Sequence, residues 1–394
     1  KSSEGLNRVC SSNIHSNVNY PSSNNSSFDG YAVNSSDTIK IKRNTPQAFK
    51  IIGSIPAGKR PFKKKIKKFN AVEIMTGGII PKGFDTVVPI EQINFDSVNK
   101  IKKFILIKER IKKYNNVRFA GSDYKKKQLI IKKGTVIQPN HILALKTLGV
   151  KRIKVKKKLN VLFFSTGNEI SNLDKIPNWK VRNSNNHYIK SLKNNFLFNF
   201  KNLGILRDKD EKKFYNKINK ILKSKTDIII TSGGVSKGKF DFIPLIIKKF
   251  KLSHFFKDIA LRPGKPILFA KIRNKKKVIF GLPGNPMSSA VCFRFFVIPY
   301  IANVLGQIRE KPIRCVLKNN FTKKKEFTRF VKSKLSTTKN GKLEVVILKG
   351  QESFRIKSFV NSNIWTLLPA GKSKFKKGDM VDCFLQNNSN QTLI

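Results

Sequence analysis

Short apolar runs alternate with longer amphipathic stretches in the second half of the chain, from about residue 158 to residue 306. Three of these runs, at 161–165, 227–231 and 277–281, are rich in Val, Ile and Phe and show no polar alternation. Such runs are typical of strands that are buried on both faces of a parallel sheet. Because strands that alternate with helices form βαβ units, this region is predicted to be an α/β domain.

The regions on either side follow a different pattern. Within 28–120, short β-branched runs are separated by Gly and Pro turns, which predicts a small β domain. Alternating strands return after about residue 306 and predict a separate C-terminal β domain. The segment 121–157 is predicted to hold two short strands, around 129–131 and 135–137, followed by a helix.

The charge of the chain is extreme, with a formal net value of +58 from 81 Lys and Arg against 23 Asp and Glu. Such a balance ordinarily indicates a polyanionic partner, such as nucleic acid or an anionic membrane. Here the lysine runs are spread over almost every segment and form no single tail or stripe, which is typical of solvated turns. The abundance of Asn, Ile and Phe also fits A/T-rich codon usage. We therefore expect no specific nucleic-acid binding.

Compartment is indicated by three further features. The four cysteines are widely separated, with no C-x-x-C pair, so neither a zinc site nor a disulfide framework is expected and a reducing compartment suits them. The first twenty residues lack the apolar core of a signal peptide. The most apolar stretch, from Ala290, is interrupted by Arg294 and Pro299 and is expected to fall short of a membrane span. These features predict a cytoplasmic protein without membrane association.

Each of the three apolar runs is followed at once by an unusual turn. The turns are TGNE at 166–169, SGGVSKGKFD at 232–241 and LPGNP at 282–286. In an open parallel sheet, ligands bind beyond the carboxyl ends of the strands. The three turns are therefore predicted to gather on one rim of the sheet.

Two of these turns have the composition of an anion site. Glycines in the turn 232–241 let backbone N–H groups approach a phosphate, while its serines donate hydrogen bonds and its lysines bring positive charge. A tight turn that binds nothing is the alternative, and the Walker spacing is not met. In the turn 282–286, Pro286 starts a helix whose free N–H groups face an anion, or it is simply a common helix start.

Acidic residues accompany this predicted phosphate site. Glu169, Asp208 and Asp241 are expected on the same rim, where carboxylates repel phosphate unless a divalent cation lies between them. The combination indicates Mg²⁺. Taken singly, Asp241 is equally well explained as a helix N-cap, and Asp29 as a turn residue.

Basic residues flank another turn, ALRPGKP, just before a strand. Arg262 and Lys265 are placed there to hold a tetrahedral or planar oxyanion, unless the turn is merely solvated. The four histidines are isolated, and no Ser/His/Asp constellation is expected.

Read together, these segments resemble the molybdopterin molybdenumtransferase family, which includes relatives of the gephyrin E domain. The resemblance runs nearly end to end. It is carried by GLNRV, SSFDGYAV, IPAG, VEIMTGGIIPKGFDTVVPIE, VRFAGSDYKKKQLIIKKGT, LGVKRIKV, VLFFSTGNEI, VRNSN, LGILRD, DIIITSGGVSKGKFD, LRPGKPILFA and GLPGNPMSSAV, in the family's order.

The resemblance implies a multidomain α/β protein with a molybdopterin-binding-type three-layer α/β domain, a β-rich lid and a C-terminal β domain. The implied domains are a segmented connecting domain (1–27 and 121–157), the lid (28–120), the α/β domain (158–306) and the C-terminal domain (307–394). It also implies a homodimer whose cleft is completed by the partner's lid. The implied reaction is Mg²⁺-dependent: adenylyl-molybdopterin and molybdate give molybdenum cofactor and AMP. Contact with the molybdopterin adenylyltransferase that makes this substrate is also expected.

The family's functional positions fall on identifiable residues of this chain. The implied catalytic residues are Asp29, Thr76, Asp123, Glu169, Asp208 and Asp241, of which Glu169, Asp208 and Asp241 are the implied Mg²⁺ ligands. The implied substrate-binding residues are Ser232, Gly233, Gly234, Ser236, Gly238, Arg262, Lys265, Pro283, Gly284, Asn285 and Pro286.

The chain departs from the family pattern at a few of these motifs. Phe28 stands where Met is usual, and Arg262 stands where Lys is usual, so bulk or charge is kept. Asn168 replaces a common Asp and removes a possible supporting carboxylate. Lys237 and Lys239 replace a smaller and an acidic residue, and Lys239 reverses a charge beside Asp241, so metal affinity is the property most affected.

Two other functions stay open from the sequence. The α/β domain alone also resembles the molybdopterin adenylyltransferase, which performs the preceding step, although the lid and C-terminal domains argue against this. A non-catalytic dimeric scaffold or a polyanion-binding protein is the alternative from another class.

Overall fold

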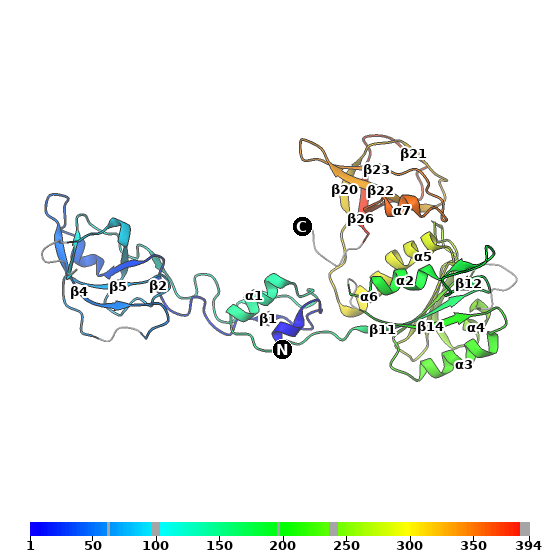
Figure 1. Cartoon of the computed structure of the whole chain (residues 1–394), viewed down its shortest axis with the longest axis horizontal. Helices are drawn as coiled ribbons and strands as arrows, with labels where there is room; N and C mark the ends of the chain where they lie inside the picture. The colour runs from blue at the N-terminus through cyan, green and yellow to red at the C-terminus, as the bar shows by residue number, and fades with distance from the viewer. Residues whose placement is uncertain (61–63, 96–102, 195–197, 236–242, 387–394) are drawn as a thin grey trace. The chain divides into compact units, whose positions relative to one another are not determined.

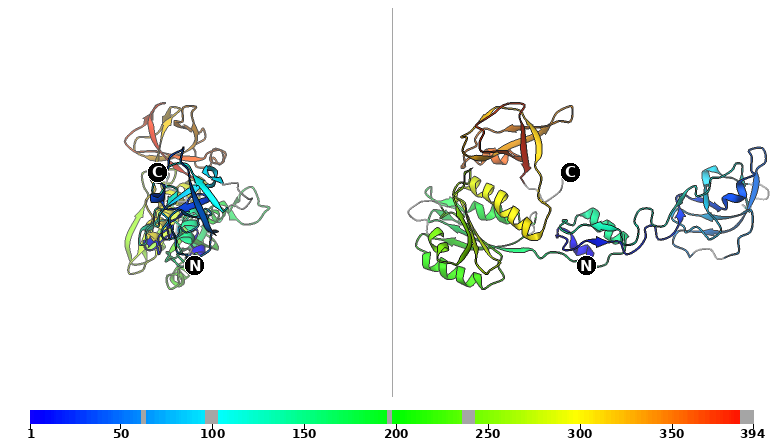
Figure 2. Two further views of the ribbon diagram at one scale, coloured as in Figure 1. Left: turned by 90° about the vertical axis from the view of Figure 1, so that its left-hand side faces the viewer. Right: turned by 180° about the vertical axis from the view of Figure 1, so that it is seen from behind.

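The computed structural model describes residues 1–60, 64–95, 103–194, 198–235 and 243–386. These residues form two compact units, whose elements are labelled in Figure 1 and seen from two further directions in Figure 2. The first unit comprises Lys1–Glu4, Asn13–Lys132 and Pro139–Ile153, and the second comprises Gly5–Ser12, Lys133–Gln138 and Lys154–Ile394. The limits of these two units differ from the limits of the four expected domains. The four-domain division therefore stays a prediction.

The first unit is built around a six-stranded mixed sheet with the order β6-β3-β5-β4-β8-β7. Its strands are β3 (Gly30–Val33), β4 (Gln47–Ile55), β5 (Asn70–Ile74), β6 (Thr86–Pro89), β7 (Asn94–Phe95) and β8 (Phe104–Ile107). Successive residues of a strand point to opposite faces, and Tyr31 joins one buried cluster while Ala32 joins another. Burial on both faces explains why β3 is apolar throughout, whereas β4 also carries polar residues at exposed and half-buried positions.

Smaller elements complete the first unit. Two short pairings, β1 (Ile14–His15) with β10 (Leu129–Ile131) and β2 (Asn25–Ser26) with β9 (Val117–Arg118), accompany helix α1 (Pro139–Thr147). The strand predicted at 135–137 is not a strand, because only Val136 pairs there, in an isolated bridge to Val9 within the second unit.

The α/β part of the second unit is a three-layer structure. Its sheet has the order β14-β11-β15-β19-β18-β16, in which the first four strands are parallel. The bounds are β11 (Leu159–Thr166), β14 (Phe198–Leu206), β15 (Ile228–Ser232), β16 (Leu252–Lys257), β18 (Leu268–Ile272) and β19 (Val278–Leu282). The three apolar runs are therefore neighbouring parallel strands, as the sequence predicts.

Helices cover both faces of this sheet (Figure 1). One core cluster joins Ile228 and Ile230 to α2 (Ser184–Ser191) and to a long helix composed of α5 (Pro286–Cys292), η4 (Phe293–Val297) and α6 (Ile298–Leu305). The other cluster joins Ile229 to α3 (Glu211–Leu222) and α4 (Ile243–Lys248). The alternation of Ile228, Ile229 and Ile230 between the two clusters explains the unbroken apolar run.

The long helix from Pro286 to Leu305 has 20 residues, and an 18-residue window within it has a mean hydropathy of 1.5, so by length and composition alone it is enough to cross a membrane. This corrects the expectation that the segment falls short. In the structure 61% of its apolar window is buried, and Phe293, Val297 and Ile301 pack in the sheet core. Core packing accounts for its apolar character.

The C-terminal part of the second unit is a closed β structure. Strands β22 (Thr328–Thr337), β23 (Leu343–Ile347), β20 (Ile313–Leu317), β26 (Met380–Leu385) and β24 (Ile364–Leu368) pair in that order, and β24 pairs back to β22. A further strand, β17 (Leu261–Arg262), comes from the α/β part and pairs in parallel with β22. A backbone ladder thus joins the two parts of this unit. The α/β fold with β-rich domains is confirmed.

Candidate active site

The turns that follow β11, β15 and β19 meet at one rim of the sheet. Thr166 Oγ1 donates a hydrogen bond of 3.1 Å to the Ser232 carbonyl, and the Gly233 N–H donates one of 2.8 Å to the Leu282 carbonyl. The predicted convergence of the three turns is therefore confirmed for their described residues. Such a rim is where α/β sheets bind ligands.

Close approach of the turns requires glycine at position 233. Gly233 has a φ of +96°, and a Cβ atom there would lie 2.6 Å from the Thr166 carbonyl oxygen. Gly234 follows with a φ of +66°, and the Cβ position of Gly284 is 3.5 Å from the Gly233 Cα atom. Because these two successive glycines have positive φ and no side chain, the backbone N–H groups of the turn stay accessible to a ligand.

Asn185 ties two of the turns together and was not recognised from the sequence. It lies in the first turn of α2, and its Nδ2 donates to Ser232 Oγ at 2.8 Å and to the Gly284 carbonyl at 2.8 Å. Nearby, Ser165 Oγ donates to Asn183 Oδ1 at 2.5 Å. The VRNSN motif therefore holds the rim in place. A polar residue at a helix start usually suggests only capping, so its role shows only in three dimensions.

The turn after β11 is fastened to Arg207 and Asp208. Arg207 Nη1 donates to the carbonyls of Gly167, Asn168 and Ile170 at 3.0, 3.1 and 2.9 Å. Asn168 Nδ2 donates to Asp208 Oδ2 at 2.6 Å, while the Asp208 N–H donates back to Asn168 Oδ1 at 3.3 Å. The structure thus brings Asp208 beside the predicted site turn. The Glu169 side chain is exposed next to them.

Several predicted residues lie outside the described part of the chain. They are Ser236, Gly238 and Asp241, together with Lys237 and Lys239. Among the residues described, no three His, Cys, Asp or Glu side chains are grouped to hold a metal ion. The predicted trio of Glu169, Asp208 and Asp241 includes one residue outside that part, so it stays a prediction.

The basic loop 262–266 lies at the same sheet edge. Strand β18 begins at Leu268, which pairs with Gly281 at the end of β19, so the preceding loop is close to the turn 282–286. Arg262, Lys265 and Ser288 all line one cavity of about 910 Å³. The guanidinium of Arg262 also lies over the Phe327 ring, with 4.4 Å from Cζ to the ring centroid.

Arg329 is a third cation in this cavity and was not predicted. It is the direct pairing partner of Arg262 across β17 and β22. Burial, together with the positive charge of Arg262, lowers the pKa of Arg329 from its usual value. Since two guanidinium groups held side by side repel each other, the arrangement favours an anion between them.

The helix start at 283–286 carries polar groups that lack partners. Asn285 precedes α5 and Pro286 is at its first turn, as predicted. In the described part of the chain, Asn285 Oδ1 and Ser289 Oγ are buried and have no hydrogen-bond partner. Buried polar atoms of this kind are usually satisfied by water or a ligand.

Three predicted residues belong to the first unit. Asp29 Oδ1 accepts hydrogen bonds from the Thr76 N–H at 2.6 Å and from Thr76 Oγ1 at 2.7 Å. These bonds hold the pKa of Asp29 below its usual range. Asp123 is exposed, and its N–H donates to the Tyr20 carbonyl. The structure therefore brings Asp29 and Thr76 together.

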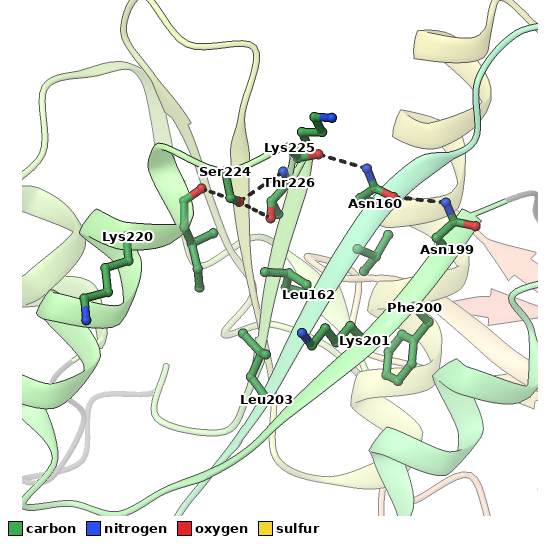
Figure 3. Close-up of a pocket in the computed structure, with 12 residues that line it drawn as sticks. Asn160, Leu162, Asn199, Phe200, Lys201, Leu203, Lys220, Ser224, Lys225 and Thr226 are labelled. Carbon is green, nitrogen blue, oxygen red and sulfur yellow. Dashed lines mark hydrogen bonds between the residues drawn. The ribbon is translucent and has the colours of Figure 1, made fainter.

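A different hollow, of about 470 Å³, lies toward the amino ends of β11 and β15 (Figure 3). Its lining includes Leu162, Phe200, Leu203 and Thr226, and Asn199 Nδ2 donates to Asn160 Oδ1 at its border. It contains none of the predicted site residues and lies away from the carboxyl ends of the strands. We therefore assign the site to the rim.

Three family models match successive parts of the chain. They describe the MoeA N-terminal region, domains I and II (residues 1–149), a probable molybdopterin binding domain (163–303) and the MoeA C-terminal region, domain IV (314–385). Two solved structures of the molybdopterin biosynthesis MoeA protein from Pyrococcus horikoshii are similar. They have TM-scores of 0.80 and 0.82 at 26% and 23% identity, and each comparison covers 98% of this chain and 93% of the other.

Curated relatives extend the similarity over nearly the full chain. The molybdopterin molybdenumtransferase of Staphylococcus aureus strain COL is 33% identical over 387 residues, which is 97% of this chain and 89% of the relative. The enzyme of the same name from Bacillus subtilis strain 168 is 33% identical over 392 residues, which is 98% of this chain and 89% of the relative. With this identity over this length, the chain belongs to the molybdopterin molybdenumtransferase family.

Proposed function

We propose that this chain inserts molybdenum into adenylyl-molybdopterin, using molybdate and Mg²⁺ and releasing AMP. The observation that carries the proposal is the basic cavity at the rim. Arg262, Lys265 and Arg329 line a space of about 910 Å³, where Lys349 and Glu352 are the other charged lining residues, so positive charge is in excess, which suits a dianion such as molybdate. The glycine turn at 232–234 lies on the same sheet edge and suits phosphate.

Within this proposal the three cations hold molybdate, and the dithiolene sulfurs of the pterin meet it there. Ser232, Gly233 and Gly234 hold the phosphate end of the substrate, and Asn185 fixes Ser232 against the turn at Gly284. Fixed donors that surround a developing negative charge stabilise it without reorganisation. The residues therefore act by positioning and electrostatics as the phosphoanhydride link to AMP breaks.

The donor set at 168–169 and 208 fits Mg²⁺, which prefers carboxylate and amide oxygens. Glu169 has an exposed carboxylate, and Asp208 keeps one oxygen free of the bond to Asn168 Nδ2. With Asp241, these groups would hold the ion. When bound, Mg²⁺ would neutralise negative charge on the phosphates. Asp29, Thr76 and Asp123 are the other residues to which the proposal gives a catalytic role.

The proposal extends to assembly and location. We infer a homodimer in the cytoplasm in which the lid of one subunit completes the cleft of its partner. The substrate comes from an adenylyltransferase, and contact with that enzyme is part of the proposal. The Asp29–Thr76 pair is the part of the lid expected to reach the substrate.

The test is release of AMP from adenylyl-molybdopterin with and without molybdate. We expect release that needs both molybdate and Mg²⁺, and we expect Asp241→Ala and Asp208→Ala to lose it. Unchanged turnover in both variants would refute the metal role. Consumption of ATP without molybdate would instead identify the adenylylation step, and intact substrate under all conditions would indicate a non-catalytic binder.

A further inference from the structure

One side of the basic cavity is lined by residues that were not among the predicted site residues. Besides the loop 262–266, the cavity is lined by the continuous segment from Ile347 to Phe354, which we call the wall loop. The wall loop begins at Ile347, the last residue of β23. Part of it, including Lys349 and Gly350, also borders a second hollow of about 450 Å³. A loop that borders two hollows has little packed side-chain support, so its position depends on polar contacts.

One buried lysine supplies most of those contacts. Lys332 lies on β22 and is 2% exposed. Its Nζ donates hydrogen bonds to the carbonyls of Gly350, Arg355 and Glu352 at 2.8, 3.0 and 3.2 Å. An ammonium group has three donors, so all of them are used on the wall loop and the residue that follows it.

Gln351, in the wall loop, makes hydrogen bonds to the backbone of Lys332. Its Oε1 accepts from the Lys332 N–H at 3.0 Å, while its Nε2 donates to the carbonyls of Lys332 and Leu348 at 2.8 and 2.7 Å. The Leu348 N–H donates to the same Lys332 carbonyl at 3.0 Å. Lys332 therefore holds the wall loop through its side chain and through both of its backbone groups.

A cation is a costly anchor at this place. A buried ammonium loses its hydration, and its neighbours Arg329 and Arg355 are also positive, with Glu352 as the compensating carboxylate. Burial lowers the pKa of Lys332 to about 8, the positive charges of Arg329 and Arg355 add to this effect, and the Glu352 carboxylate opposes it. A neutral side chain would hold a loop without this penalty. Arg329, three residues earlier on the same strand, lines the cavity and interacts electrostatically with Lys332.

We propose that Lys332 is a positioning residue for the oxyanion, because its ammonium group fixes the wall loop beside Arg329 and adds positive potential to the cavity. The inference rests on the proposed function of that cavity as the molybdate site. It places Lys332 behind the residues that touch the anion. Loss of the ammonium group then weakens oxyanion binding more than it slows the chemical step.

The pH dependence follows from the charge. As pH rises through about 8, Lys332 loses its proton, one of its donors and its positive charge. Molybdate stays a dianion in this range. Molybdate binding by the wild-type protein is thus expected to weaken between pH 7 and pH 9, and Lys332→Arg is expected to bind without this loss.

The experiment compares Lys332→Met and Lys332→Arg with Lys334→Met, a control that removes an exposed lysine from the same strand. Molybdate binding is measured by calorimetry on the full chain, and AMP release gives KM for molybdate and kcat. We expect Lys332→Met to weaken binding about tenfold, the equivalent of about 1.4 kcal/mol, with the loss in KM and little change in kcat. Equal binding by Lys332→Met and Lys334→Met would overturn the inference.

Hydrogen exchange of the wall loop provides a readout that needs no ligand. Exchange in 348–354 is expected to be faster in Lys332→Met than in Lys334→Met at the same pH. Gln351→Ala, which keeps the ammonium group, serves if Lys332→Met does not fold, and it should also speed exchange there. Unchanged exchange in either folded variant contradicts the inference. Failure of the wild-type protein to bind molybdate, with the exchange effect present, contradicts the proposed function instead.

Discussion

The amide of Asn168 donates a hydrogen bond of 2.6 Å to the carboxylate of Asp208. An Asn at this position was expected only to remove a supporting carboxylate. In the structure the Asn168 amide donates a hydrogen bond to one carboxylate oxygen of Asp208 and so orients the Asp208 side chain. The chain therefore carries one carboxylate and one amide where two carboxylates would otherwise meet.

Asn168→Asp is expected to change the Mg²⁺ requirement. Two carboxylates at this distance repel each other, which raises the pKa of one of them unless a cation lies between them. The variant should need less Mg²⁺ for half-maximal AMP release and should lose stability when Mg²⁺ is absent. Asn199→Asp, at the hollow shown in Figure 3, is the control and should do neither. A Mg²⁺ titration identical in both variants would count against a metal at this turn.

Asn185→Ala should lower kcat with little loss of stability. The substitution removes the two bonds of 2.8 Å through which Asn185 joins Ser232 and Gly284, so the two turns at the rim lose their alignment. Misplaced binding groups cost rate, about 10²-fold for a shift near 1 Å. Lys190→Ala, on the exposed face of the same helix, is the control. Wild-type kcat in Asn185→Ala would show that the turns keep their alignment without it.

Gly233→Ala should destabilise the protein, whereas Gly284→Ala should be mild. At position 233 the φ of +96° is unfavourable for alanine, and the new Cβ would approach the Thr166 carbonyl oxygen to 2.6 Å. We expect a loss of about 2 kcal/mol or more in the free energy of unfolding. At position 284 the nearest atom would be 3.5 Å away. Thermal unfolding of the two variants side by side decides this.

Glu310→Gln should be costly for folding because it removes the carboxylate charge that faces a buried guanidinium. Arg294 is 1% exposed and makes two bonds to Glu310, at 2.6 and 2.8 Å. Breaking one partner of such a pair costs about 3 kcal/mol or more. Glu211→Gln breaks an exposed pair with Lys249 and should cost less than about 1 kcal/mol. Denaturant unfolding measures both, and equal effects would contradict the burial argument.

Trp179 should report ligand binding at the rim. It is 73% exposed, and two residues later the Val181 N–H donates to the Glu169 carbonyl at 2.9 Å, so this segment lies against the site turn. The other tryptophan, Trp365, is 1% exposed, and Trp365→Phe leaves Trp179 as the single emitter. A pterin or AMP bound at the rim should change its fluorescence. Binding seen by calorimetry without any such change would place the ligand elsewhere.

The sequence predicts the parallel strands well because their signal is local. Ile228, Ile229 and Ile230 are all apolar since both faces of β15 are covered, and that pattern is visible in five residues. The rim follows from strand direction alone. The segment 135–137 is also largely apolar, yet only Val136 forms a bridge. A strand also needs a neighbouring strand to pair with, and the local sequence does not show whether one is present.

The missed site residues depend on pairings between distant segments. Arg329 reaches the basic cavity because β17 and β22 place it beside Arg262, which is 67 positions earlier. Asn185 acts through Ser232 and Gly284, which follow it by 47 and 99 positions. In the sequence alone, Arg329 looks like an exposed charged residue and Asn185 looks like a helix cap. Their positions at the rim and the cavity become visible only when the pairing of distant segments is known.

The pairing of β17 with β22 limits how the chain can be divided. Because Leu261 and Arg262 form a strand beside the closed β structure, a fragment that starts after residue 306 would keep Arg329 but leave part of β22 without its neighbour. A slip of one residue along this ladder would turn Arg262 to the opposite face. The C-terminal β structure is therefore not a detachable accessory: excising it, or exchanging it between relatives, would dismantle the basic cavity along with the β17–β22 pairing.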